Sequence, residues 1–160
     1  MNTQLPTESK FLVTGGAGFI GSNFVRKIVS QGYKVNVLDK LTYAGNLENI
    51  RSFIESGQIV FFHGDICDPL ITSEALNGVD VVVNFAAESH VDRSINGASD
   101  FVQTNIVGVQ VLLDAIKAAG RKIRFLQVST DEVYGSIESG SWTEEWPILP
   151  NSPYSASKAG

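Results

Sequence analysis

One short stretch, residues 13–22 (VTGGAGFIGS), constrains the fold of this chain more than any other. An apolar run precedes it, and a segment with helical spacing of apolar residues follows it. A strand that turns tightly into a helix needs glycines at this spacing: Gly15 for the turn, Gly18 for close approach of a pyrophosphate, and Gly21 for packing of the helix on the strand. The first turn of such a helix offers free N–H groups to phosphates.

Apolar runs and helical patterns alternate along the rest of the chain, which gives the glycine spacing its context. The predicted strands are residues 10–14, 33–38, 58–63, 79–85 and 123–128. The predicted helices are residues 21–31, 47–54, 69–76 and 101–119. Strands that are apolar throughout, separated by helices, are typical of a parallel sheet covered on both faces. The sequence therefore predicts a doubly wound α/β sheet, a Rossmann fold, with ligands at the carboxyl ends of its strands.

Composition limits the class of protein. The 160 residues are 43% hydrophobic and 18% charged, which is typical of one soluble globular domain. The net charge is −5 without a cluster of Lys or Arg, so we expect neither nucleic acid nor an anionic membrane surface as partner.

Cysteine content and the chain ends bear on the compartment. The single cysteine, Cys67, excludes an internal disulfide, and no Cys or His lies at the spacing of metal ligands, so we expect no metal site. Residues 1–10 are polar and show no signal peptide, and no apolar run approaches the roughly 20 residues that span a bilayer. A cytoplasmic location is expected.

Polar or small residues follow each of the second, third and fourth predicted strands. Asp39 lies 18 residues beyond Gly21, where a carboxylate binds the adenosine ribose and favours NAD over NADP; a turn or helix-cap role is the alternative. Asp65 and Ile66 could meet an adenine, although a turn role for Asp65 is nearly as good. Ala86 and Ala87 suit close passage of a dinucleotide, and the nearby His90 either faces the cleft or is a polar loop residue.

A hydroxyl and two carboxylates, Thr130, Asp131 and Glu132, follow the fifth strand. An adjacent acid and base can donate and remove protons if their environments separate their pKa values. The same residues also form a good helix N-terminus, with Thr130 or Asp131 as the cap. The residues alone leave both interpretations open.

Tyr154 and Lys158 are four residues apart, so on a helix they share one face. A nearby ammonium favours the phenolate and lowers the pKa of a tyrosine, which could then act as a base on a hydroxyl. We therefore expect Lys158 to lower the pKa of Tyr154.

Residues 14–21 (TGGAGFIG) together with the Tyr154-x-x-x-Lys158 pair resemble the extended short-chain dehydrogenase/reductase family. Residues 39–46 (DKLTYAGN), 86–94 (AAESHVDRS) and 129–135 (STDEVYG) make the chain most similar to the sugar-nucleotide dehydratases of that family, which act on dTDP-glucose. The resemblance covers residues 10–160. The Thr-Asp-Glu triplet discriminates best, since epimerases of this fold generally lack the paired carboxylates.

The resemblance implies NAD-dependent dehydration of the nucleotide sugar to a 4-keto-6-deoxy sugar. Tyr154, with Lys158, would take the proton of the 4-hydroxyl, which Thr130 would bind, while hydride passes from C4 to NAD and later to C6. Glu132 would remove the C5 proton and Asp131 would protonate the departing 6-hydroxyl. Ser89 and Thr130 would contact the substrate. The implied cofactor contacts are Gly15, Gly18, Phe19, Ile20, Gly21, Asp39, Lys40, Leu41, Thr42, Asp65, Ile66, Ala86, Ala87, Thr104, Tyr154 and Lys158.

Chains of this family are longer and carry a C-terminal substrate domain, whereas this one stops two residues past Lys158. We therefore expect residues 1–160 to be an incomplete NAD-binding domain that keeps some NAD affinity but turns over poorly or not at all. The resemblance also implies a homodimer for the full-length enzyme, packed through the predicted helix 101–119 and the Tyr154 helix. The alternatives are another NAD-dependent nucleotide-sugar epimerase or decarboxylase, and a non-catalytic NAD-binding module.

Overall fold

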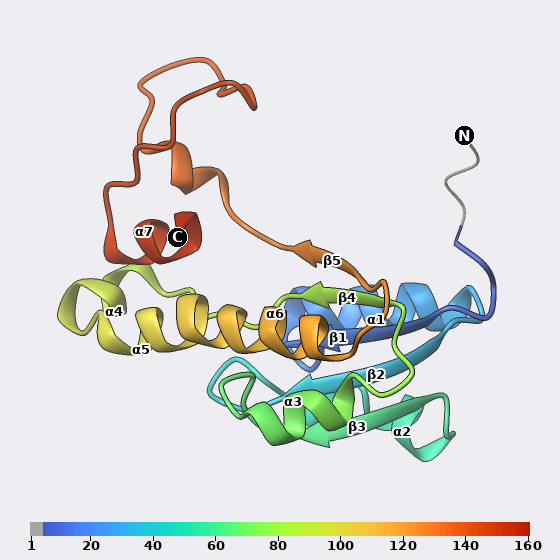
Figure 1. The fold of residues 1–160 in the computed structure, drawn as a ribbon. Coiled ribbons are helices and arrows are strands. Elements are labelled where there is room, and N and C mark those ends of the chain that lie inside the picture. The colour runs from blue at the N-terminus through green and yellow to red at the C-terminus, as the bar shows by residue number, and fades with distance from the viewer. Residues whose placement is uncertain (1–4) are drawn as a thin grey trace.

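The computed structural model describes residues 5–160, apart from the side chains of Arg93 and Asn96. Residues 1–4, the start of the polar N-terminal stretch in which no signal peptide was expected, lie outside the described residues. The described residues form a five-stranded parallel sheet of order β3-β2-β1-β4-β5 (Figure 1). The strands are β1 (Lys10–Thr14), β2 (Lys34–Asp39), β3 (Ile59–His63), β4 (Val81–Asn84) and β5 (Arg124–Gln127). The predicted doubly wound fold is confirmed.

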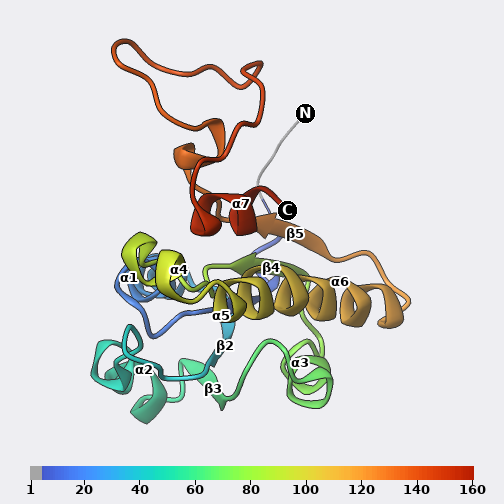
Figure 2. The same cartoon turned by 90° about the vertical axis from the view of Figure 1, so that its left-hand side faces the viewer.

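Helices cover both faces of the sheet (Figures 1 and 2). Successive strand residues point to opposite faces, so Phe11 and Val13 belong to one apolar core and Leu12 to the other. The first core includes Val25 of α1, and α3 and α6 pack over the second. The helices are α1 (Phe19–Ser30), α2 (Arg51–Glu55), α3 (Pro69–Ala75), α4 (Val91–Asn96), α5 (Ser99–Val102), α6 (Gly108–Ala118) and α7 (Pro153–Ala159).

Two predicted helices differ from the structure, and one helix of the structure was not predicted. The predicted helix 101–119 is interrupted by a π-helical segment, η2 (Gln103–Val107), between α5 and α6. The predicted helix 47–54 is divided at the buried Ile50 into a 3₁₀ turn, η1 (Leu47–Asn49), and α2. Helix α4 was not predicted. No helix in the described part of the chain is long and apolar enough to cross a membrane.

The strand order reverses at β1, which pairs with β2 on one side and β4 on the other. Ligands of such sheets bind at this point, beyond the carboxyl ends of the strands. Helix α7 packs against α4, α5 and η2 and against the 3₁₀ turn η3 (Asp131–Tyr134). Residues 136–152, which join η3 to α7, extend away from the sheet (Figures 1 and 2). The fold thus brings α7 and η3 to the same end of the molecule.

Candidate active site

The glycine turn between β1 and α1 is tightly packed against its neighbours. Gly15 has φ +67°, and a Cβ there would lie 2.6 Å from the backbone nitrogen of Ala86. A Cβ on Gly21 would lie 2.2 Å from the Gly15 carbonyl oxygen. At Gly21, α1 therefore lies closer to the turn than any residue with a side chain would allow. Gly18 is the N-cap of α1 and no side chain caps the helix. The first-turn N–H groups are therefore open to an anionic ligand.

A cleft of about 530 Å³ lies at the carboxyl ends of the strands and extends from the glycine turn to α7. This volume is typical of small-molecule and cofactor sites. The predicted site residues on its wall are Gly15, Gly18, Phe19, Ile20, Gly21, Asp39, Lys40, Thr42, Asp65, Ile66, Ala86, Ala87, Ser89, Thr104, Tyr154 and Lys158. The predicted site residues that do not line it are Leu41, Thr130, Asp131 and Glu132.

Asp39 joins the glycine turn to the end of β2. One carboxylate oxygen accepts a hydrogen bond from the Ala17 N–H at 2.9 Å, and the other accepts from the Leu41 N–H at 2.8 Å. Leu41 has φ +54° and packs against the apolar core beside α1 rather than on the cleft wall. Asp39 therefore does have a turn role, and it also lines the cleft; its ribose role stays a prediction.

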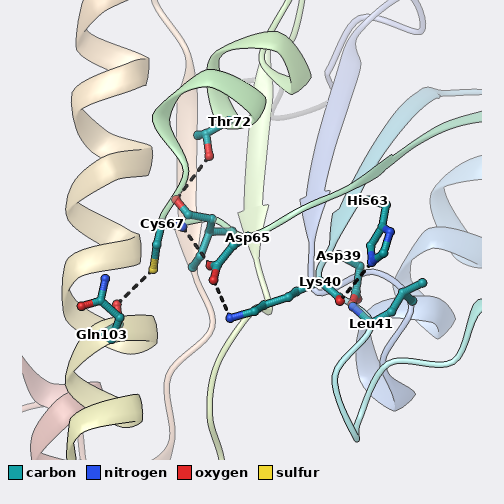
Figure 3. Close-up of polar contacts among 9 residues, drawn as sticks. Asp39, Lys40, Leu41, His63, Asp65, Cys67, Thr72 and Gln103 are labelled. Atoms are coloured by element: carbon teal, nitrogen blue, oxygen red, sulfur yellow. Dashed lines mark hydrogen bonds and ion pairs between the residues drawn. The ribbon is translucent and has the colours of Figure 1, made fainter.

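Lys40 and Asp65 form an ion pair across the ends of β2 and β3 (Figure 3). Lys40 Nζ lies 2.6 Å from Asp65 Oδ2, and this bond raises the pKa of Lys40. Burial by itself would raise the pKa of Asp65, but hydrogen bonds from the Cys67 N–H, at 3.0 Å, and from Lys40 bring it below the usual value. Both groups are therefore charged at neutral pH.

Tyr154 and the Thr130–Glu132 triplet form one cluster near the other end of the cleft. Thr130 caps η3, where its hydroxyl accepts from the Glu132 N–H at 3.3 Å, so the capping role considered for it is present. Burial raises the pKa of Tyr154, the hydrogen bond with Thr130 lowers it, and the carboxylates of Glu132 and Asp131 raise it further. Both carboxylates are therefore close enough to the phenol to act on its charge.

The expectation that Lys158 lowers the pKa of Tyr154 is wrong in this structure. Tyr154 and Lys158 do lie on one helix, α7, but the Lys158 ammonium donates a hydrogen bond of 2.7 Å to the Val128 carbonyl just beyond β5. Burial lowers the pKa of Lys158 itself. The pKa of Tyr154 is raised because burial and two carboxylates act on it.

Asn105 of η2 is a buried positioning residue that the sequence reasoning missed. Its side-chain oxygen accepts from the Glu88 N–H at 2.9 Å. Its amide donates to the Glu88 carbonyl at 2.9 Å and to the Ser157 hydroxyl at 2.8 Å. Asn105 thus ties the loop after β4 to α7. The sequence offers no signal for it, because Gln103 and Thr104 beside it are polar as well.

Tyr43 and Glu88 were also missed, although both follow predicted strands. The Tyr43 hydroxyl donates to Glu88 Oε2 at 3.1 Å, and its ring packs on that of His90 with centroids 5.1 Å apart. All three residues line the cleft, so the position of His90 near the cleft is confirmed. Together they connect the loops after β2 and β4.

Comparison with known proteins identifies the family. Residues 12–160 match the family model described as GDP-mannose 4,6 dehydratase. The chain belongs to this family. A dTDP-glucose 4,6-dehydratase of Streptomyces niveus is 52% identical over 156 residues, which cover 94% of this chain and 46% of that family member. The low-salt glycan biosynthesis protein Agl12 of Haloferax volcanii is 54% identical over 150 residues, which cover 93% of this chain and 48% of Agl12.

A solved structure of the same kind is also similar. The dTDP-glucose 4,6-dehydratase DesIV of Streptomyces venezuelae, crystallised with NAD bound, is 56% identical with a TM-score of 0.89, over 94% of this chain and 48% of DesIV. The resemblance to dehydratases is therefore confirmed. The chain spans about half the length of the curated relatives it matches.

The residues of the cleft fit a dinucleotide. Its glycine turn has no room for a Cβ at Gly15 or Gly21, the N-terminus of α1 is uncapped, and a carboxylate stands at the end of β2. Among the side chains that the structure describes, no three His, Cys, Asp or Glu are grouped to hold a metal ion.

Proposed function

We propose that the cleft binds NAD. The glycine turn and the first turn of α1 would hold the pyrophosphate, and Asp39 the adenosine ribose. Asp65 and Ile66 would contact the adenine, and Tyr154 with Lys158 the nicotinamide end. The cleft runs continuously from one group to the other, and DesIV was crystallised with NAD.

We propose further that the protein is a dTDP-glucose 4,6-dehydratase. The observation that carries this proposal is the pair of adjacent carboxylates, Asp131 and Glu132, on the turn η3 that packs against the helix of Tyr154. A module that only binds a dinucleotide has no use for two carboxylates beside a tyrosine of its cleft. A nucleotide-sugar epimerase or decarboxylase is less favoured, because relatives named as dTDP-glucose 4,6-dehydratases are more than half identical to this chain.

In this proposed reaction, Tyr154, Glu132 and Asp131 each transfer a proton to or from the sugar. Tyr154 takes the proton of the sugar 4-hydroxyl in its phenolate form, which its raised pKa makes a minor form at neutral pH, and Thr130 hydrogen-bonds that hydroxyl. Bound NAD would supply the hydride chemistry, as acceptor for C4 and as donor for C6. Glu132 removes the C5 proton, which the 4-keto group has made acidic, and Asp131 protonates the 6-hydroxyl so that it leaves as water. Glu132 then returns its proton to C5, and the proton that Tyr154 took from the 4-hydroxyl replaces the one that Asp131 gave up. The net change is therefore loss of one water.

The homodimer belongs to the same proposal. Large apolar residues are exposed on one continuous stretch of α5, η2 and α6, and they would be covered by a second copy. They are Val102, Ile106, Val107 and Leu113. We also propose a cytoplasmic enzyme that supplies 4-keto-6-deoxy sugars to deoxysugar synthesis, for example of rhamnose.

The test is incubation of the purified protein with NAD and dTDP-glucose, followed by analysis for a 4-keto-6-deoxy sugar nucleotide. Because the chain spans about half of its relatives' length, we expect these 160 residues alone to turn over poorly or not at all. The assay is therefore also run on the full product of the gene, with UDP-glucose and GDP-mannose as comparison substrates. Absence of the keto product from dTDP-glucose in the full product would refute the proposal.

A further inference from the structure

We propose that Asp65 helps to exclude NADP from the cleft by holding the Lys40 ammonium away from the place of a 2′-phosphate. The inference rests on the proposed binding of NAD and deepens it. Asp39 repels a 2′-phosphate directly, whereas Asp65 would act by withdrawing the cation that could attract one.

Lys40 stands where a dinucleotide-binding sheet can acquire affinity for NADP. It follows Asp39 directly, at the end of β2, and a basic residue near this position accommodates the 2′-phosphate in NADP-binding proteins. The Lys40 side chain is 59% exposed, so no packing prevents it from turning toward such a phosphate. A free lysine here would oppose the preference for NAD that Asp39 provides.

In the structure the Lys40 ammonium lies against Asp65 and does not face the expected place of a 2′-phosphate. Lys40 Nζ lies 2.6 Å from Asp65 Oδ2, and Figure 3 shows the side chain extending from β2 toward Asp65 and away from the Asp39 carboxylate. The lysine backbone is also held, because its carbonyl oxygen lies 3.3 Å from His63 Nε2. The position of the ammonium therefore depends on Asp65.

Asp65 is fixed well enough to hold this partner. Its side chain is 28% exposed, and its Oδ1 accepts a hydrogen bond from the Cys67 N–H in the turn after β3. A carboxylate has about four acceptor positions, so two bonds leave room for a donor on the adenine. Holding Lys40 and contacting the cofactor are therefore compatible roles for one carboxylate.

The test compares the dissociation constants of NAD and NADP by calorimetry, in the wild-type chain and in Asp65→Asn, Lys40→Met and the double variant. Asparagine keeps an oxygen for the Cys67 N–H but loses the charge that holds the lysine. We expect Asp65→Asn to raise affinity for NADP relative to NAD by about fivefold, the upper end of the range for one exposed ion pair. We expect no such gain when Asp65→Asn is made in the Lys40→Met background.

Asp68→Asn is the matched control, because it removes a carboxylate in the same turn that accepts from the Leu70 N–H, a cap that asparagine also provides. Asp68→Asn should leave the ratio of the NADP and NAD dissociation constants unchanged. Lys40→Met alone should also leave this ratio unchanged, because Asp65 already holds the ammonium away from the 2′-phosphate.

The outcomes separate this inference from the proposal on which it rests. An unchanged ratio in Asp65→Asn, a gain that persists without the lysine, or weaker NADP binding in Lys40→Met would overturn the inference alone. Failure of the wild-type chain to bind either dinucleotide would overturn the proposed function and the inference with it.

Discussion

The close approach of the glycine turn to the loop after β4 can be measured by one pair of substitutions. Gly15 and Gly57 have nearly the same positive φ, +67° and +70°, so alanine strains both backbones alike. Around Gly57 nothing lies within 4 Å of an added Cβ, whereas at Gly15 the Cβ would lie 2.6 Å from the Ala86 nitrogen. We expect Gly57→Ala to lower the free energy of unfolding by about 1–2 kcal/mol, from left-handed backbone strain alone.

For Gly15→Ala we expect a loss of about 2–5 kcal/mol, because overpacking against the rigid backbone of Ala86 adds about 1–3 kcal/mol to the same strain. Urea unfolding followed by circular dichroism measures both losses, and the slope with denaturant should stay constant. NAD binding should be lost in Gly15→Ala and kept in Gly57→Ala. Equal losses of stability in the two variants would refute the close packing between the turn and Ala86.

Two further predictions concern the other end of the cleft. Subtracting the ultraviolet titration of Tyr154→Phe from that of the wild type isolates Tyr154, whose pKa should lie above the usual value for tyrosine. Glu132→Gln should lower the pKa of Tyr154, because it removes a negative charge that opposes the phenolate. An upward shift would contradict the proximity of the two groups. Asn105→Ala, which breaks three bonds at a buried site, should lower the free energy of unfolding by about 3 kcal/mol. Tyr43→Phe removes an exposed hydroxyl that donates to Glu88 and should cost less than about 1 kcal/mol. Equal costs in urea unfolding would contradict the role given to Asn105.

The sheet could be predicted because its strands are continuous apolar runs between helical patterns. Strand β1 begins and ends where predicted, and the turn after it required glycine for reasons visible in the sequence. The break in the helix at η2 could not be predicted. It coincides with Asn105, whose partners Glu88 and Ser157 lie 17 residues before it and 52 after it, and local periodicity carries no signal of such contacts.

In the candidate site, too, features set by the local sequence could be predicted and features set by long-range contacts could not. Asp39, Asp65 and Tyr154 line the cleft, as expected of two residues that follow strands and one that shares a helix face with Lys158, and their roles stay predictions. Tyr154 was wrongly predicted to be the partner of the Lys158 ammonium, which instead bonds to the Val128 carbonyl. The i, i+4 rule says which side chains share a helix face, but not which backbone carbonyl lies close to them in the fold. The Lys40–Asp65 pair joins two strands that pair only in the folded sheet.

The most direct test of the account is the Glu132→Gln variant of the full gene product, incubated with NAD and dTDP-glucose. Oxidation at C4 depends on Tyr154 and should survive, so reduced cofactor and a 4-keto sugar that keeps its 6-hydroxyl should accumulate. Loss of water requires a base at C5, so the 4-keto-6-deoxy product should be absent or strongly reduced. Formation of that product at the wild-type rate would contradict the assignment of Glu132 as the base that removes the C5 proton.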